Sequence, residues 1–263
     1  MKEFTTEAIE RIEELIDGQH RDEVLAEIEG MHPADIAELF QHLNLRQAEW
    51  VFELIPNREA KADVLMELDE EDRKKLLEGM DPEQIGHYID LLDTDDAVDL
   101  IQELDEADRE EVIQNIGDVE QAGDIVDLLQ YDEDTAGGLM GTELISVNEN
   151  LSMPDCLKEM RHQAEDLDDI YNVYVVDDDN RLKGVLPLKK MITHPSVSKI
   201  KHVMETDPMS VKVDMPIEEV AIDFEKYDLV AMPVVDSIGR LMGQITVDDV
   251  MDQVREQQER DYQ

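Results

Sequence analysis

A short apolar repeat occupies the first half of the chain and limits what that half can fold into. Apolar residues recur every 12 positions, with a single step of 13 between Ile55 and Leu68. The series is Met31, Leu43, Ile55, Leu68, Met80, Leu92, Leu104 and Ile116. A fixed short period is typical of arrays in which each unit packs mainly against its neighbours. We therefore expect the first half to be a stack of small, similar units.

Each unit carries the signals of a short helix. In four consecutive units an aspartate follows the apolar anchor, and an acid or amide stands three positions later, which is typical of a helix N-cap. These aspartates are Asp69, Asp81, Asp93 and Asp105. An apolar pair such as Leu100–Ile101 then shares one helical face with the next anchor. A helix of about nine residues cannot bury this stripe alone, so stacked neighbours are expected to form an all-α superhelix.

The charge of the chain excludes several classes of partner. The 263 residues include 68 Asp and Glu against 23 Lys and Arg, a formal net charge of −45. Residues 1–130 hold 39 of these acids and 10 of the bases, a net charge of 10 − 39 = −29. Such a surface repels phosphate backbones and anionic membrane faces, so no nucleic-acid partner is expected. It attracts divalent cations, although most of the acids are expected to be solvated or to cap helices.

Cysteine content and hydropathy place further limits on the chain. Cys156 is the only cysteine, which excludes an intramolecular disulfide framework and suits a reducing cytoplasm. No secretory signal follows Met1, and no apolar run approaches the roughly 18 residues of a membrane span. We therefore expect the chain as given to be soluble, with Cys156 as a core thiol rather than a nucleophile.

The second half contains a duplicated unit of another kind. Residues 174–186 and 233–245 align at an offset of 59, with Val-Val-Asp, Arg-Leu and a glycine at matching places. Each segment is typical of a strand, a turn and a second strand. Upstream strands are expected at 144–147 and 209–213, helices at about 153–164 and 217–227, and further helices from 188 and 247 onward. The predicted order is therefore β-α-β-β-α, twice.

Two connecting segments separate these parts of the chain. Pro195, Ser196 and Ser198 mark the link between the two copies. Residues 131–141 contain Gly137, Gly138 and Gly141, and glycines gathered in this way indicate a hinge between the acidic repeat and the duplicated units.

The duplicated units resemble a pair of cystathionine-β-synthase (CBS) domains. The motif DTAGGLM at 134–140, between an acidic helical repeat and such a pair, is more specific. The combination, over about residues 20 to 255, resembles the cytosolic region of the MgtE family of magnesium channels and transporters. It implies an all-α superhelical repeat domain followed by an α/β tandem CBS pair. The implied boundaries are 1–130 for the repeat domain, 131–198 for the hinge and first CBS domain, 199–256 for the second, and 257–263 for the start of a helix toward an absent membrane domain.

The resemblance also implies a function, as a magnesium-sensing regulatory region rather than an enzyme. In the family, Mg²⁺ ties the helical domain to the second CBS domain of a homodimer on the cytoplasmic side of the cell membrane, and compaction closes the pore. The matching metal positions are Asp95, Asp99 and Asp249, with Glu218 and Asp228 as further ones. Asp95 and Asp99 are four residues apart, so on a helix they face the same way and a cation between them would relieve their repulsion.

An adenine nucleotide, ATP or another, is the second expected ligand, because CBS pairs often hold one between their copies. In such sites a Thr or Ser followed three residues later by Asp grips the ribose. The second copy has this pair in Thr246 and Asp249, whereas the first has Pro187 and Lys190, which supply neither a hydroxyl nor an acceptor. We expect at most one strong cleft per chain, with Lys189 or Lys190 near the phosphates.

Other interpretations remain open from the residues alone. The seven histidines show no metal-ligand spacing, and no Gly-Lys-[Ser/Thr] follows Gly137–Gly138, so catalysis and a Walker loop are not indicated. The alternative function is a soluble CBS adenine-nucleotide sensor whose helical repeat docks a protein partner. A repeat scaffold similar to flagellar motor switch proteins explains the superhelix but leaves the CBS pair idle. A gene that continues past Gln263 into apolar stretches of about 20 residues would favour the transporter.

Overall fold

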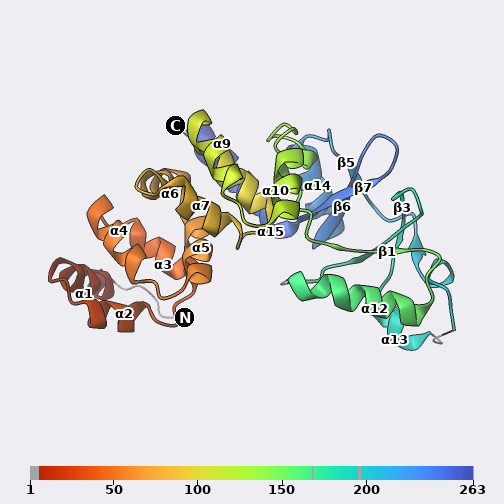
Figure 1. Ribbon diagram of the computed structural model, residues 1–263, viewed down its shortest axis with the longest axis horizontal. Coiled ribbons are helices and arrows are strands. Elements are labelled where there is room, and N and C mark those ends of the chain that lie inside the picture. Colours follow the sequence, from red (N-terminus) through yellow and green to blue (C-terminus); the bar gives the residue numbers. More distant parts are fainter. Residues whose placement is uncertain (1–5, 168, 195–196, 263) are drawn as a thin grey trace. The chain divides into compact units, whose positions relative to one another are not determined.

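The computed structural model describes residues 6–167, 169–194 and 197–262 (Figure 1). Contacts between Cα atoms divide the chain into two units, Met1–Gly123 and Asp124–Gln263. The first unit is helical and the second combines helices with two small sheets, which confirms the predicted fold class. Pro195 and Ser196, expected to mark the link between the copies, lie outside the described residues.

The first unit is a succession of short helices. They are α1 (Thr6–Asp17), α2 (Arg21–Ile28), α3 (Pro33–Phe40), α4 (Leu45–Leu54), α5 (Arg58–Glu67), α6 (Glu70–Leu77), α7 (Pro82–Ile89), α8 (Thr94–Gln102) and α9 (Glu106–Gln114), and α10 (Val119–Leu128) contains the division between the units. Alternate helices pack together: α3 on α5, α5 on α7 and α7 on α9, and likewise α2 on α4 and α4 on α6. Most of these helices therefore bury their apolar stripe against the helix two places along the chain, whereas α1 packs mainly on α2, and α8 contacts α9.

The predicted helix starts are confirmed. The N-cap residues of α6, α7, α8 and α9 are Asp69, Asp81, Asp93 and Asp105, and these helices are eight or nine residues long. Asp81 Oδ1 accepts a hydrogen bond from the Gln84 amide at 2.8 Å, and the Gln84 side chain accepts one from the Asp81 amide at 3.1 Å. This reciprocal pair is a capping box, which satisfies two amides that the first turn of a helix cannot pair internally.

The apolar anchors line the interior of the helical unit. Ile55, Leu68, Leu92, Leu104 and Ile116 are buried. Met31, Leu43 and Met80 are partly buried against a cluster built mainly from α1–α6. With few aromatic residues available, this interior consists mostly of Leu, Ile and Val. The 12-residue period therefore places one buried anchor at the end of each helix-and-turn unit.

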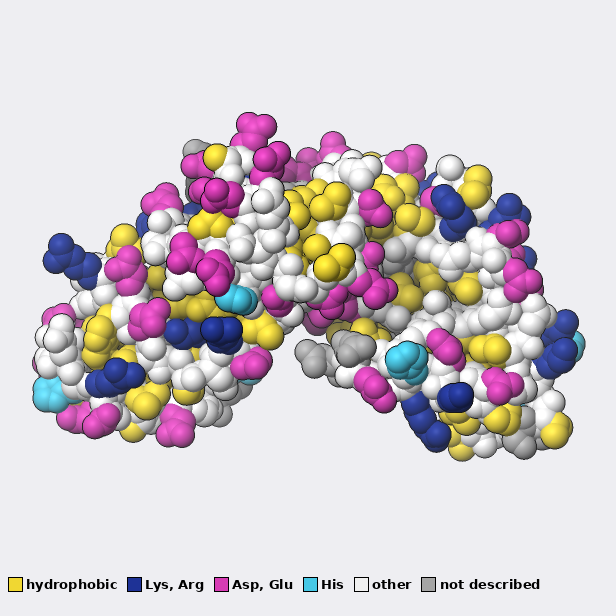
Figure 2. Space-filling model, viewed as in Figure 1, with side chains coloured by type: hydrophobic (Ala, Val, Ile, Leu, Met, Phe, Trp, Pro, Cys, Tyr) yellow, Lys and Arg dark blue, Asp and Glu magenta, His cyan; other side chains and the backbone are white. Residues whose placement is uncertain are grey.

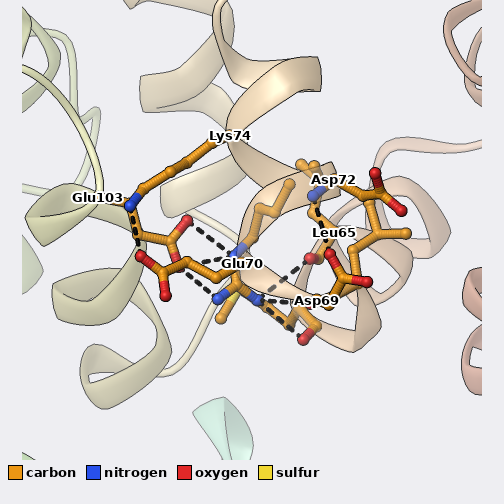
Figure 3. A network of polar contacts seen from close by, with 9 residues as sticks. Leu65, Asp69, Glu70, Asp72, Lys74 and Glu103 are labelled. Atoms are coloured by element: carbon orange, nitrogen blue, oxygen red, sulfur yellow. Dashed lines mark hydrogen bonds and ion pairs between the residues drawn. The ribbon is translucent and has the colours of Figure 1, made fainter. Parts of the chain in front are cut away.

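One buried cation ties three segments of the helical unit together (Figure 3). The guanidinium of Arg73 donates through Nε to both carboxylate oxygens of Glu103 at 3.0 Å, and through Nη1 to the carbonyls of Met66 at 3.1 Å and Leu68 at 3.2 Å. The side chains of Arg73 and Glu103 are only 6% and 10% exposed. Since the last carbonyls of α5 have no partner within their own helix, Arg73 caps that helix while it pairs with Glu103, the C-cap residue of α8.

Replacement of Arg73 by Met should destabilise the helical unit by about 3–5 kcal/mol, because it leaves the Glu103 carboxylate buried without its partner. Trp50, the only tryptophan, lies in α4 against the core of this unit, so urea unfolding followed by its fluorescence measures the loss. The matched control is Lys74→Met, which removes a half-exposed pair with Glu70 and should cost less than about 1 kcal/mol. Equal losses in both variants would contradict a special role for Arg73.

The second unit contains two small sheets, one for each copy. In the first copy, the strands β1 (Ile145–Asn148), β2 (Val173–Val176), β3 (Leu182–Val185) and β4 (Glu205–Thr206) lie in the order β1-β2-β3-β4. In the second copy, β5 (Val211–Lys212), β6 (Ala231–Val235) and β7 (Leu241–Thr246) lie in the order β5-β6-β7. The first pair of each sheet is parallel and the later pairs are antiparallel.

Helices complete both copies in the predicted β-α-β-β-α order. They are α12 (Met153–Gln163) and α13 (Leu188–Thr193) in the first copy, and α14 (Ile217–Tyr227) and α15 (Val247–Tyr262) in the second.

Cys156 on α12 is fully buried, and this burial, followed by the charge of Glu159, raises the pKa of its thiol to about 11. Such a thiol stays protonated, as expected for a core residue. Strand β4 and the short helix α11 (Ala136–Leu139) were not predicted.

The two copies exchange edge segments. Strand β4 comes after the link between the copies, yet it pairs with β3 of the first copy. Gly141 comes before the first copy, yet it exchanges two main-chain hydrogen bonds of 2.9 Å with Gln244 on β7 of the second copy. Each sheet is therefore completed by residues that precede the other copy in the chain, so neither copy has its full set of hydrogen bonds alone.

The β-hairpin turns of the copies also meet. Leu182 N donates to Gly239 O at 3.0 Å, and Leu241 N donates to Asn180 O at 2.9 Å. Asn180 and Gly239 occupy matching positions at the offset of 59 and both have positive φ angles, of 61° and 85°. Asparagine and glycine tolerate this left-handed conformation better than other residues, which explains their presence in the turns.

Candidate functional site

Residues 132–143, here called the strap, connect α10 to the first copy but are bound to the second. Ala136 N donates to Met215 O and Gly137 N to Val213 O, both at 2.8 Å, and Ile217 N donates to Asp134 O at 3.1 Å. The Gly141–Gln244 pairing continues this attachment along β7. The DTAGGLM motif is therefore a segment that is hydrogen-bonded to the second copy over most of its length.

Close packing explains the glycines of the strap. A Cβ atom on Gly138 would lie 2.3 Å from the carbonyl oxygen of Asp132, and one on Gly137 would lie 2.7 Å from the Tyr131 ring. Neither glycine has a positive φ angle, so conformational freedom is not what these positions need. The expected hinge stays a prediction, and what the structure shows at Gly137 and Gly138 is that there is no room for a side chain.

Thr246 and Asp249, the expected ribose-binding pair, bind each other. Asp249 Oδ2 accepts hydrogen bonds from the main-chain amide and the hydroxyl of Thr246, both at 2.7 Å. Burial raises the pKa of the Asp249 carboxyl to about 6 against these two hydrogen bonds, which lower it, and Asp248 and Asp252 add a smaller rise. Asp249 thus lies in the first turn of α15 as a carboxyl group whose ionisation burial disfavours.

The raised pKa gives a pH dependence of definite sign. In the unfolded chain Asp249 should titrate near the ordinary aspartate value of about 3.9. The folded protein therefore binds the extra proton between about pH 4 and pH 6, and the stability that this contributes is lost as the pH rises through about 6. At neutral pH the ionised carboxylate destabilises the second copy unless a cation compensates it.

The substitution Thr246→Val should raise the pKa of Asp249 above about 6, because it removes the hydroxyl donor that favours the ionised form while β7 keeps a β-branched residue. Carboxyl carbon chemical shifts, recorded against pH, measure this directly. Asp236 is the internal reference: burial raises its pKa, but hydrogen bonds from Arg240 and Ile238 outweigh this effect and hold the pKa below the usual range. A titration midpoint of Asp249 near pH 4 in the native protein would contradict a raised pKa.

The five expected metal ligands lie on or next to three helices. Asp95 and Asp99 belong to α8 in the first unit, Glu218 to the first turn of α14, and Asp249 to α15, while Asp228 is the C-cap residue that follows α14. Asp95 is half-buried, whereas Asp99, Glu218 and Asp228 are exposed. Glu218 and Asp228 are ten residues apart, about 15 Å along a helix, so they cannot hold the same ion. Among the described residues, no group of three or more His, Cys, Asp or Glu side chains is arranged to hold a metal ion.

A cavity of about 180 Å³ opens in the first copy beside the start of α13, the helix that carries Lys189, which was expected near nucleotide phosphates. It is lined by Ile170, Tyr171, Asn172, Val173, Val185, Leu186, Pro187, Leu188 and Glu205. At the offset of 59, Tyr171 and Leu188 match Val230 and Val247, which are joined in the second copy by a hydrogen bond of 2.9 Å from Val247 N to Val230 O. We call this space the first-copy cavity.

The residues that exclude a ribose grip also explain why the two copies differ. The Thr246–Asp249 lock needs an amide hydrogen and a carboxylate, and the matching residues Pro187 and Lys190 have neither. Lys190 pairs instead with Glu205 at 3.3 Å, and Glu205 lines the cavity. The Pro187 and Lys190 substitutions were visible in the sequence, but their effect on the local fold was not inferred from it.

Comparisons with known proteins agree with this architecture. The MgtE intracellular N domain matches residues 31–134, and the CBS domain matches residues 136–196 and 200–256. A crystal structure of the cytosolic domain of the Mg²⁺ channel MgtE in complex with ATP is 32% identical, with a TM-score of 0.83, over 93% of this chain and 99% of that one. The chain belongs to the MgtE family. A second structure, the soluble part of a magnesium transporter, is 28% identical with a TM-score of 0.77, over 95% of this chain and 97% of that one.

Curated MgtE relatives extend beyond the matched region. The magnesium transporter MgtE of Thermus thermophilus is 34% identical over 88% of this chain and 51% of its own length. The magnesium transporter MgtE of Enterococcus faecalis is 36% identical over 54% of this chain and 32% of its own length. The chain thus spans about half the length of the first relative, and its match covers about a third of the second. Within its described part, no helix has the length and apolarity that a membrane crossing requires.

The family assignment confirms the expected resemblance and its class of function. An MgtE N domain followed by two CBS domains is a regulatory arrangement and not a catalytic one, as the absence of a catalytic motif predicted. The strap is the point at which the helical N domain becomes attached to the CBS pair.

Proposed function

We propose that this MgtE chain is the magnesium-sensing region of a magnesium transporter, on the cytoplasmic side of a cell membrane, and that it acts on a membrane domain. The observation that carries the proposal is the match to an MgtE N domain and two CBS domains, together with 32% identity to the cytosolic domain of the Mg²⁺ channel MgtE over 93% of this chain. Asp249 is a candidate ligand, because burial raises its pKa and a divalent cation nearby would offset that effect. The N domain supplies acids for such an ion, with Asp95 and Asp99 on one face of α8.

The mechanism follows from charge and from the coordination preference of magnesium. Mg²⁺ takes oxygen ligands in octahedral geometry and keeps several of its waters, so one or two carboxylates from each domain are sufficient. Two chains carry 2 × −45 = −90, and the face in Figure 2 shows acidic side chains over the helical unit. Without divalent ions the acidic domains repel one another. Ions that bind the compact state more tightly shift the population toward it and, in this proposal, close the pore.

A homodimer through the CBS pair is part of the same proposal. Apolar side chains reach the surface of the second unit (Figure 2). Ile192 on α13, Ile222 on α14 and Met251 on α15 are 85%, 60% and 57% exposed. Burial of these residues in an interface would stabilise it by roughly 25 cal/mol for each Å² of apolar surface removed from water.

The double substitution Asp95→Asn and Asp99→Asn should weaken the response to Mg²⁺. Loss of two carboxylates reduces repulsion but also reduces metal binding, and at millimolar Mg²⁺ the second effect should dominate because exposed charges are screened. Small-angle X-ray scattering should show the native chain contracting as Mg²⁺ is added, and the variant requiring about tenfold more, which corresponds to roughly 1.4 kcal/mol.

The control for this experiment changes the same charge elsewhere. Asp22 and Glu23 are exposed on α2, far from the α8 pair in the sequence, so Asp22→Asn with Glu23→Gln removes two charges without touching the proposed ligands. This variant should contract like the native chain. An equal loss of contraction in both variants would show that bulk charge sets the response, and the five metal roles would then be withdrawn.

An adenine nucleotide is the proposed second ligand, supported by the similar MgtE structure that was crystallised with ATP. The first-copy cavity offers an apolar wall and the Tyr171 ring for a base, with Lys189 exposed on α13 near the phosphates. In the second copy, Thr246 and Asp249 already hydrogen-bond to each other, so a ribose would have to replace that bond. We therefore favour the first-copy cavity over the Thr246–Asp249 cleft that the sequence predicted.

Titration calorimetry with ATP should give no more than one site per chain. Tyr171→Ala should weaken binding about tenfold or more, since stacking of a base on an aromatic ring is worth roughly 1–3 kcal/mol. Thr246→Val should have little effect. The reverse order of effects would assign the nucleotide to the second copy, and two equal sites would show that Pro187 and Lys190 do not prevent binding. ATP binding together with an unchanged radius of gyration in Mg²⁺ would favour the alternative function, a soluble nucleotide sensor.

A further inference from the structure

A continuous chain of side-chain hydrogen bonds runs from the first-copy cavity to the strap. Asn172, which lines the cavity, donates through Nδ2 to the hydroxyl oxygen of Tyr174 at 3.4 Å. The Tyr174 hydroxyl donates to Gln244 Oε1 at 3.0 Å, and Gln244 Nε2 donates to the carbonyl oxygen of Glu143 at 2.7 Å. The three bonds thus link both copies and the strap through four residues.

Two members of this chain are buried polar groups in apolar surroundings. Tyr174 is fully buried and Gln244 is 6% exposed, and beside Tyr174 lie Val176 and Leu241. An apolar pair of similar volume would fill this space without desolvating polar atoms. A buried, satisfied polar pair instead fixes one relative orientation of the elements that carry it. Here those elements are β2 of the first copy and β7 of the second.

The direction of the hydrogen bonds makes the chain sensitive to the cavity. Burial raises the pKa of Tyr174 to about 12, so its hydroxyl remains a donor at physiological pH. That single hydrogen points toward Gln244, and the hydroxyl oxygen accepts from Asn172 on the cavity side. A ligand that accepts the hydrogen bond of the Asn172 amide removes the bond from Asn172 to Tyr174. Because neighbouring hydrogen bonds polarise one another, the bond from Tyr174 to Gln244 then weakens.

The other end of the chain holds the strap by two means. Gln244 binds Glu143 through its side chain and Gly141 through its main chain, with both main-chain bonds at 2.9 Å. The strap is also the covalent connection between α10 and the CBS pair. A change in the hydrogen bonds of Gln244 therefore alters the strap, the segment that connects the N domain to the CBS pair.

We propose that Tyr174 and Gln244 are positioning residues that couple occupancy of the first-copy cavity to the strap. The ligand part of this inference rests on the proposed nucleotide site, whereas the coupling itself is a property of the chain without ligand. Coupling of this kind is reciprocal, so the state of the strap also changes the affinity of the cavity.

A double-mutant cycle without ligand tests the coupling. In the full chain, Asn172→Ala should speed hydrogen exchange of strap amides 138–143 about threefold, within the range expected for coupled networks. In a Tyr174→Phe background, which keeps the ring and removes the hydroxyl, Asn172→Ala should leave that exchange unchanged. Asn150→Ala and Tyr227→Phe, at exposed positions of the same unit, are the controls and should act independently. Purely additive effects of Asn172→Ala and Tyr174→Phe would overturn the proposal.

ATP provides the second arm. It should bind the native chain and Tyr174→Phe within about twofold of each other, but it should change strap exchange only in the native chain, as expected when a coupling energy is lost without loss of the site. An identical strap response in both would overturn the coupling. A non-additive cycle with no ATP binding by calorimetry would support the coupling and overturn the nucleotide proposal, so the two failures are distinguishable.

Discussion

The excess of carboxylates is the constraint that organises this protein. A chain with 68 acids and 23 bases cannot pair every carboxylate with a Lys or Arg side chain, so the fold must solvate most of the others or give them main-chain partners. The repeat uses the second solution, with aspartates such as Asp69 and Asp81 that accept amide hydrogens at helix starts. The hairpin turns repeat it with Asp177 and Asp236, each of which accepts two amides of its own turn. Burial of a carboxylate in the helical unit, at Glu103, is accompanied by burial of Arg73.

Asp249 differs from a turn aspartate such as Asp236, because its pKa is raised and not lowered. It accepts two hydrogen bonds from Thr246, as the capping aspartates accept theirs, yet burial prevails and raises its pKa. In a protein that elsewhere stabilises its carboxylates, an acid held against ionisation is well suited to respond to a cation. The same two hydrogen bonds join β7 to α15 in the second copy. Pro187 and Lys190 cannot form them in the first copy, where the first-copy cavity lies. Cation sensing and nucleotide binding are thus proposed for matching places in two copies that have diverged.

Much of the fold could be predicted because its signals are local. The 12-residue period, the aspartate caps and the strand-turn-strand duplication each act over fewer than about fifteen residues, within the range where hydrophobic period and capping determine structure. Helix starts at Asp69 and Asp105 and the β-α-β-β-α order of elements along the chain in both copies were therefore correct. Of the site, the Thr246–Asp249 contact was predicted as a pair of residues, but not as a pair that bind each other. Strand β4 is two residues long and has no periodicity to detect.

The sequence by itself determined which elements form and what charge they carry, because caps, period and composition act through neighbours in the chain. Only the tertiary structure decided which elements complete one another. By sequence, residues 136–196 match one CBS domain, but Gly141 pairs with Gln244 about a hundred positions away, and β4 pairs back with the first copy. Gly137 and Gly138 likewise suggested a hinge, and only the structure shows that they are sites of close contact. Edge pairing and contact between distant backbones depend on what lies opposite in space, and no local pattern records that.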